Sequence, residues 1–149
     1  MASVVVGIDG TEASREALRW AADEAKLRGA ALRVLHGWSR PYAVSGPNPQ
    51  SHRPAVDEED TERRLAEELV DRELAATGVE VTGVRIEREP VEGPPAKTLI
   101  DAAQHADLLV IGSDRHGRLA HEPLGRIGRE CVQHAPCPVV IVRPMASRE

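Results

Sequence analysis

The richest chemistry in this chain lies in one glycine-bounded segment of its C-terminal part. Gly112 ends an apolar, strand-like run, and Gly125 precedes the start of a helical pattern. Glycine lets a backbone approach an anion closely, and the free N–H groups at a helix start point toward it. Arg115 and Arg118 within the segment, with Arg126 just after it, add cations to a chain whose net charge is −5. The segment therefore predicts an anion-binding loop, and phosphate is the usual anion in such loops of α/β proteins.

A carboxylate occupies the corresponding place after the first strand-like run. Residues 4–8 are apolar or glycine, and Asp9 follows them directly. A carboxylate at the end of a buried strand most often accepts hydrogen bonds from a ribose or from the start of the next helix. A general base or a metal ligand is the less frequent role. We therefore expect Asp9 to face a ligand or to hold a turn.

Alternating strand and helix patterns position these residues. Strands are predicted at residues 4–9, 32–37, 79–86, 108–111 and 138–142, and helices at 11–29, 57–77, 96–103 and 124–135. The alternation over 79–86 is typical of a half-exposed edge strand. The stretch 38–56 is rich in Pro, Ser, Asn and Gly, which predicts a long loop. Helix-length crossovers join the strands, so the pattern predicts an α/β fold with an open five-stranded parallel sheet and helices on both faces.

Two strand orders fit this pattern, and they place Asp9 differently. In the order 3-2-1-4-5 the first and fourth strands are neighbours, so Asp9 and Gly112 meet where the winding reverses. In the order 2-1-3-4-5 Asp9 lies beside the end of the third strand, where Glu87, Arg88 and Glu89 suit an anion less well. Ligands of open parallel sheets bind outside the carboxyl ends of the strands at that reversal. The side chains therefore favour the first order.

Length and composition exclude several classes of protein. The 149 residues suit a single domain over residues 1–149, and 41% hydrophobic residues can build its core. No apolar run is long enough to cross a membrane and no signal-peptide pattern opens the chain, so the expected location is the cytoplasm. The acidic balance argues against binding to nucleic acid or to an anionic membrane. Cys131 and Cys137 form no CxxC pair, so a disulfide framework is not expected.

Several short motifs of this chain are shared with one known family. They lie at residues 6–11 (VGIDGT), 35–38 (LHGW), 91–96 (VEGPPA), 107–113 (DLLVIGS) and 135–139 (APCPV). With them the chain resembles the universal stress protein domain over essentially its whole length. The resemblance implies an adenine nucleotide alpha-hydrolase-like fold with the order 3-2-1-4-5, and a homodimer formed through the last strand, Val139–Val142. For one branch of the family it also implies ATP bound without fast turnover.

The nucleotide-binding branch has a glycine motif that this chain keeps only in part. Gly112 and Gly125 match motif glycines, whereas Arg115 replaces the middle glycine and Arg126 replaces a serine or threonine. A further hydroxyl position of the motif is Gly128 here. The resemblance implies candidate residues for binding ATP or AMP: Asp9, Gly37, Ile111 and Gly112 for the adenosine, and Arg115, Gly125, Arg126 and Ile127 for the phosphates.

The two arginines leave more than one interpretation open. Arg115 adds bulk where glycine allows close approach and could fill the pocket. Arg126 places a cation at the positive end of a helix, which costs a few tenths to about 1 kcal/mol unless an anion lies there. In the first interpretation the guanidinium groups replace the lost donors and bind phosphate. In the alternative, the loop is degenerate and the chain is a dimeric protein-interaction module that binds no nucleotide.

The sequence supports an enzymatic function less well than a binding function. A slow phosphohydrolase lacks a recognisable general base and metal ligands, so we expect a binding protein rather than an enzyme. Gly112 and Gly117 have Walker A spacing, but Arg118 and Leu119 replace the required Lys and Ser/Thr. The His and Cys residues of 116–137 match no standard zinc spacing, so no metal is predicted. No Gly-x-Ser-x-Gly elbow supports a serine hydrolase.

Overall fold

A five-stranded parallel sheet forms the centre of the molecule in the computed structural model, which describes residues 2–39, 56–113 and 124–144. The strands are β1 (Ser3–Gly7), β2 (Ala31–Trp38), β3 (Ile86–Glu92), β4 (Leu108–Gly112) and β5 (Val139–Val142). They lie in the order β3-β2-β1-β4-β5, and every neighbouring pair is parallel. The favoured sheet order is therefore confirmed, and β1 and β4 are neighbours where the winding reverses.

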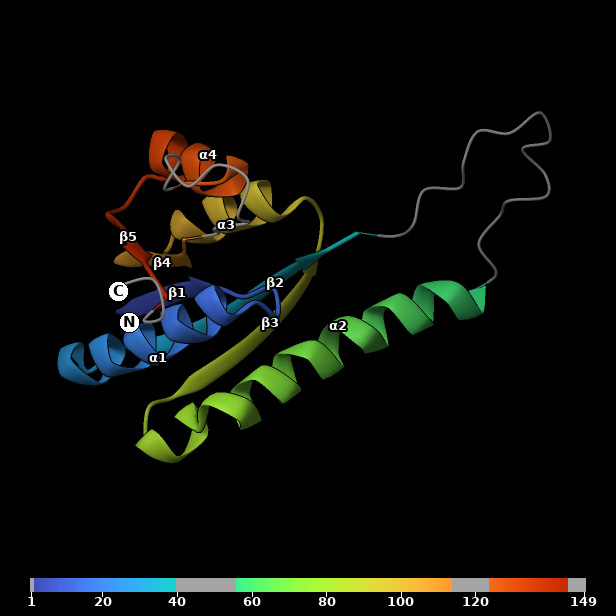
Figure 1. The fold of residues 1–149 in the computed structure, drawn as a ribbon, viewed down its shortest axis with the longest axis horizontal. Helices are drawn as coiled ribbons and strands as arrows, with labels where there is room; N and C mark the ends of the chain where they lie inside the picture. Colours follow the sequence, from blue (N-terminus) through green and yellow to red (C-terminus); the bar gives the residue numbers. More distant parts are fainter. Residues whose placement is uncertain (1, 40–55, 114–123, 145–149) are drawn as a thin grey trace.

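Helices cover both faces of this sheet. Helices α1 (Glu12–Arg28) and α2 (Val56–Thr77) lie on one face, and α3 (Pro95–Ala103) and α4 (Arg126–His134) lie on the other (Figure 1). The side chains of β1 alternate between two cores, since Val4 and Val6 pack toward α1 and Val5 packs toward α3. All three valines are fully buried, as expected for a strand covered on both sides. The predicted α/β architecture is confirmed.

Local signals explain the first crossover helix. The Thr11 hydroxyl caps α1 by accepting the backbone N–H of Ser14, and Gly29 ends the helix in the left-handed conformation with a φ of 62°. Between them Ala17, Ala21 and other small residues are buried against the sheet. Because alanine side chains are short, α1 lies close to β1 and β4 in a chain that contains no phenylalanine.

The third strand differs from its prediction. Residues 79–82 form a short 3-10 helix, η2 (Val79–Thr82), and β3 begins only at Ile86. Gly78 and Gly83 flank η2 with φ values of 69° and 82°, so the chain turns on both sides of it. Val79 is buried in the core beside α1. This contact explains why residue 79 is apolar, although it is not part of a strand. The charged residues 87–89, assigned to the end of the strand by sequence, lie within it.

The predicted loop at 38–56 falls mostly outside the described residues. Strand β2 runs one residue into it, to Trp38, and α2 begins at Val56. The side chains of residues 56–60 are likewise not described. Among the helices that the structure describes, none combines the length and apolar character needed to span a bilayer.

Candidate functional site

A cavity of about 270 Å³ opens at the carboxyl edge of the sheet, where β1 and β4 are neighbours. Its walls come from the tips of β1, β2 and β4 and from the first turns of α1, α3 and α4. The predicted site residues that line it are Asp9, Gly37, Ile111, Gly112, Gly125, Arg126 and Ile127. Arg115, the remaining candidate, lies outside the described residues. The fold therefore brings together candidates that are more than one hundred residues apart in the sequence.

The turn after β1 fixes the carboxylate of Asp9. Its Oδ1 atom accepts the backbone N–H of Thr11 at 2.9 Å and the Thr11 hydroxyl at 2.6 Å. The backbone N–H of Asp9 in turn donates to the hydroxyl of Ser14 at 3.3 Å. Within the described residues Oδ2 has no hydrogen bond, and Asp9 is exposed at the cavity. This carboxylate is thus oriented by one oxygen and can accept a ligand hydroxyl with the other.

Gly112 is required by the close approach of a helix. A Cβ atom at this position would lie 2.6 Å from the backbone carbon and oxygen of Ala13, in the first turn of α1. Likewise, a Cβ at Gly37 would lie 2.8 Å from Thr98 Oγ1 and 3.0 Å from Pro95 Cα, at the start of α3. Gly112 also lines the cavity, so its contact with a ligand stays a prediction. These glycines let two helix starts reach the strand tips and form the cavity walls.

The start of α4 supplies the positive side of the cavity. Gly125 is the N-cap residue in an extended conformation, and it offers no capping side chain to the N–H groups of the first turn. Arg126, the first residue of α4, is 89% exposed, and its Nε atom lies 3.3 Å from Oε1 of Glu130. Of the described residues that line the cavity, Asp9 carries the negative charge and Arg126 the positive charge. Gly128, the lost hydroxyl position, also lines it.

Some lining residues were missed by sequence reasoning. His36 and Leu35 lie beside the predicted Gly37, and Pro95 and Leu99 come from α3. Nδ1 of His36 lies 2.9 Å from the carbonyl oxygen of Ile8, which can only accept, so Nδ1 carries the proton in this contact. The sequence could have indicated His36 as a lining residue, because it lies next to a predicted strand end. The α3 residues carried no such signal, because only the sheet order brings that helix over Gly37.

The thiols near this site are not suited to nucleophilic chemistry. Cys131 is a fully buried residue of α4, and burial together with the charge of Glu130 raises its pKa to about 11. Burial, aided by the charge of Asp107, also raises the pKa of the Cys137 thiol. Both thiols are therefore protonated at neutral pH. Across the described residues, no three His, Cys, Asp or Glu side chains are grouped as a metal site would require.

Comparisons with known proteins agree with this architecture. The family model for the universal stress protein family matches residues 1–143. Universal stress protein Rv2623 of Mycobacterium tuberculosis is 34% identical over 142 residues, which are 95% of this chain and 45% of that protein. The chain thus spans about half the length of the curated relatives that it matches.

Solved structures share the fold at lower identity. Universal stress protein UspA from Lactobacillus plantarum superposes with a TM-score of 0.75 at 21% identity, covering 95% of this chain and 97% of that one. A universal stress protein family member from Arabidopsis thaliana, solved with AMP bound, has a TM-score of 0.67 at 18% identity and covers 98% and 94%. From its sheet order, its cavity and the match of nearly its whole length, the chain belongs to the universal stress protein family.

Proposed function

We propose that this chain is a stress-response binding module that holds an adenine nucleotide, AMP or ATP, in the cavity between Asp9 and Arg126. The observation that carries the proposal is the placement of this cavity at the reversal point of a parallel sheet, where nucleotide ligands bind. One carboxylate and one guanidinium line it, matching a ligand with donor hydroxyls and an anionic group. The AMP bound to the plant protein of the same fold supports this ligand class.

The proposed pose follows from the lining of the cavity. The base lies against Gly37 and Ile111, where Pro95 and Leu99 make the wall apolar. The free oxygen of Asp9 accepts a ribose hydroxyl.

The phosphate faces α4 in this pose. Backbone N–H groups of its first turn, from Gly125 to Ile127, and the guanidinium of Arg126 donate to the phosphate oxygens. Gly112 forms the wall between the two halves of the site, and Arg115 is proposed as a further phosphate contact. A cavity of about 270 Å³ is at the small end of ligand pockets, which favours AMP over a triphosphate.

We further propose that the module binds without fast turnover and acts in the cytoplasm as a single domain over residues 1–149. Thr11 occupies one oxygen of Asp9, which suits a positioned acceptor better than a mobile general base. No metal is needed in this proposal, because Arg126 and the helix start supply the positive potential.

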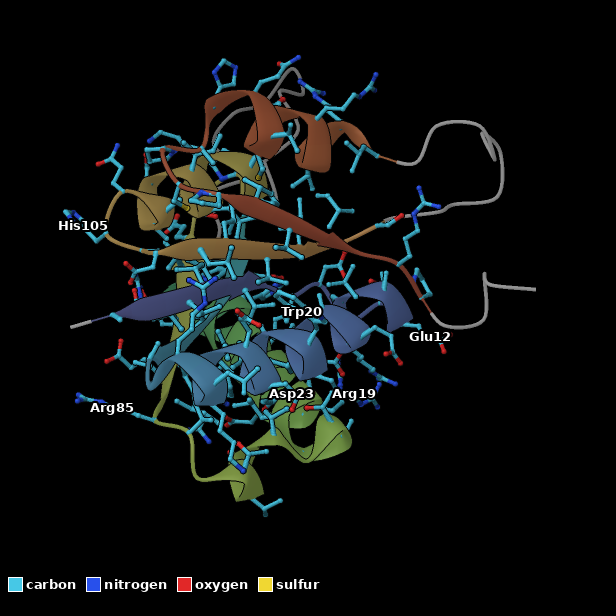
Figure 2. The ribbon with its side chains drawn as sticks, turned by 90° about the vertical axis from the view of Figure 1, so that its left-hand side faces the viewer. Glu12, Arg19, Trp20, Asp23, Arg85 and His105 are labelled. Carbon is cyan, nitrogen blue, oxygen red and sulfur yellow. The ribbon has the colours of Figure 1, made fainter. Side chains whose placement is uncertain are left out.

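A homodimer is proposed through the open edge of β5. The four residues Val139–Val142 are each half-buried, and within the described part of the chain their strand pairs with β4 alone. Trp20 of α1 is 37% exposed, and Figure 2 shows it on the side of the molecule where β5 lies. An apolar edge strand beside an exposed tryptophan favours pairing with a second copy.

Calorimetric titration and thermal unfolding with AMP, ADP and ATP test the nucleotide proposal. A ligand at one hundred times its Kd should stabilise the fold by about 2.7 kcal/mol. Asp9→Asn should weaken AMP at least several-fold, since the amide keeps one acceptor but loses the charge.

Asp23→Asn is the matched control for this titration. This variant also replaces an aspartate by asparagine, but Asp23 lies on the solvent side of α1 in Figure 2. It should leave AMP affinity unchanged. Absence of any binding at millimolar nucleotide would favour the alternative, a protein-interaction module with a degenerate loop.

A further inference from the structure

We infer that Glu130 competes with the nucleotide phosphate for the guanidinium of Arg126. The loss of this ion pair weakens every ligand that carries a phosphate, and the stronger charge of a dianionic monoester offsets that loss better than the single charge of a cyclic diester. The inference rests on the proposed nucleotide site and adds to it a residue that lies outside the cavity lining.

The ion pair joins a residue of the cavity lining, Arg126, to a residue outside that lining, Glu130. Glu130 is one turn further along the helix than Arg126, with side-chain exposures of 43% and 89%. Helical side chains normally lean toward the N-terminus, so Glu130 reaches back over the preceding turn to meet Arg126. The phosphate position lies at the N-terminal end, beside Gly125. A phosphate at that end and Glu130, one turn away, therefore compete for the same guanidinium.

This pair is easily broken. Nε to Oε1 is a single long contact of 3.3 Å rather than a bidentate pair. Both side chains are exposed, and the basic residue precedes the acidic one, which is the less favourable orientation on a helix. A phosphate can thus displace Glu130 at a small cost in affinity. This loss of affinity applies only to ligands that carry a phosphate, because adenosine has no group that binds Arg126.

Charge decides which phosphate displaces Glu130 well. A phosphate monoester carries about −1.5 to −2 charges at pH 7, because its second pKa is near 6. A cyclic diester carries a single charge, as the Glu130 carboxylate does. Exchanging Glu130 for a diester therefore brings little electrostatic gain at Arg126, whereas exchanging it for a monoester brings a clear gain. The N–H groups at the start of α4 act in the same direction.

Calorimetric titration of the full chain with AMP, 3′,5′-cyclic AMP and adenosine tests the inference. Glu130→Gln should tighten AMP and cyclic AMP by about two- to fivefold, the range expected for an exposed ion pair, and leave adenosine unchanged. Glu24→Gln is the matched control, because it breaks another i,i+4 pair, with Arg28 on α1, and neither residue lines the cavity. It should change none of the three affinities. Arg126→Gln should weaken AMP and bring its affinity closer to that of cyclic AMP.

The pH dependence gives a second readout. Between pH 7.5 and 5.5 the monoester gains a proton, with a pKa near 6, and the diester does not. The preference for AMP over cyclic AMP should therefore decline over this range. The titratable or charged groups that face the ligand from β1, β2 and α4 are Asp9, His36 and Arg126. Adenosine measured at each pH reports how their own titration affects binding.

The outcomes separate this inference from the proposed function. If Glu130→Gln leaves AMP affinity unchanged or weakens it, Glu130 positions Arg126 rather than competing for it, and the inference is wrong. Equal affinities of the wild type for adenosine and AMP would also overturn it, while the nucleoside site would stand. If the wild type binds neither ligand, the proposed function fails and the inference fails with it.

Discussion

The structural role of each glycine in this protein depends on which atoms lie next to its Cα. At Gly112 the neighbouring atoms belong to the backbone of Ala13 and Ser14, which cannot move without displacing α1. At Gly128 the nearest atom is Cδ2 of Leu124, 3.3 Å from where a Cβ would lie, and it is the end of a flexible side chain beside the cavity. Glycine is therefore strictly required at position 112 and only loosely required at position 128.

Replacing each of these glycines by alanine should give opposite results. Gly112→Ala forces a Cβ to 2.6 Å from backbone atoms and should lower the free energy of unfolding by about 2–3 kcal/mol. Gly128→Ala lies inside α4, where alanine is favoured by up to about 1 kcal/mol, so it should be neutral or slightly stabilising. Urea denaturation measures both values. Equal losses in the two variants would contradict the close approach of α1 to Gly112.

At the scale of elements, α1 and α2 are joined by an ion pair between a helix surface and the core. Glu73 of α2 is completely buried, and Nε of Arg15 lies 3.1 and 3.0 Å from its two carboxylate oxygens. The hydrogen bond and the charge of Glu73 raise the pKa of Arg15. Because Arg15 is in the first turn of α1, this pair also fixes the helix start that forms a wall of the cavity.

Breaking that pair should cost more than breaking a surface pair. Arg15→Met leaves the carboxylate of Glu73 buried without its partner, and the Tm should fall by about 5 °C. Arg19→Met is the control, since Arg19 pairs with Glu16 at the surface, and Figure 2 shows it pointing outward from α1. Its Tm should change by less than about 2 °C.

Adding Glu73→Leu to Arg15→Met should restore most of the lost stability, because an apolar pair can replace a buried ion pair. Differential scanning calorimetry of the four proteins gives the comparison. If the double variant is no more stable than Arg15→Met, desolvation of Glu73 is not the cause of the loss.

The third strand shows why an element can be misplaced by its sequence. The apolar positions of 79–86 alternate, yet Val79 is buried by packing near α1, and the pairing partner of β2 is Ile86–Glu92. That strand contains Glu87, Arg88 and Glu89, whose charges hid it. Arg33 of β2 explains one of them, because its Nε lies 2.6 Å from an oxygen of Glu89 across the two strands. A cross-strand ion pair of this kind is not visible until the strands are aligned.

At the scale of the whole molecule, the proposed homodimer depends on the edge of β5 that faces away from β4. The carbonyls of Pro138 and Val142 accept hydrogen bonds from Leu109 and Ser113 on the β4 side. Since backbone direction alternates along a strand, the N–H of Ile141 faces the open edge. A partner strand would require this donor.

Ile141→Pro should therefore disrupt a homodimer while leaving the β4–β5 ladder intact, because it removes only a donor on the open edge. Ile141→Ala is the control, since it also removes the isoleucine side chain but keeps the backbone N–H. Sedimentation velocity should show a dimer for the wild type and for Ile141→Ala, and a monomer for Ile141→Pro. A dimer in all three proteins would place the interface elsewhere.

The sequence by itself determined the order of elements, the buried strands and the positions of Asp9 and Gly112 at strand ends. These features depend on local periodicity, on caps such as Thr11 and on breakers such as Gly29, all of which act within a few residues. It also carried the family resemblance, because the motifs at those strand ends are short and contiguous.

Only the tertiary structure decided what those strand ends meet. It placed Ala13 against Gly112, Pro95 against Gly37 and Arg126 at the cavity, and it moved the third strand to Ile86–Glu92. The physical reason is that these contacts join residues far apart in the chain, so their energies depend on strand order and helix position rather than on neighbouring residue types.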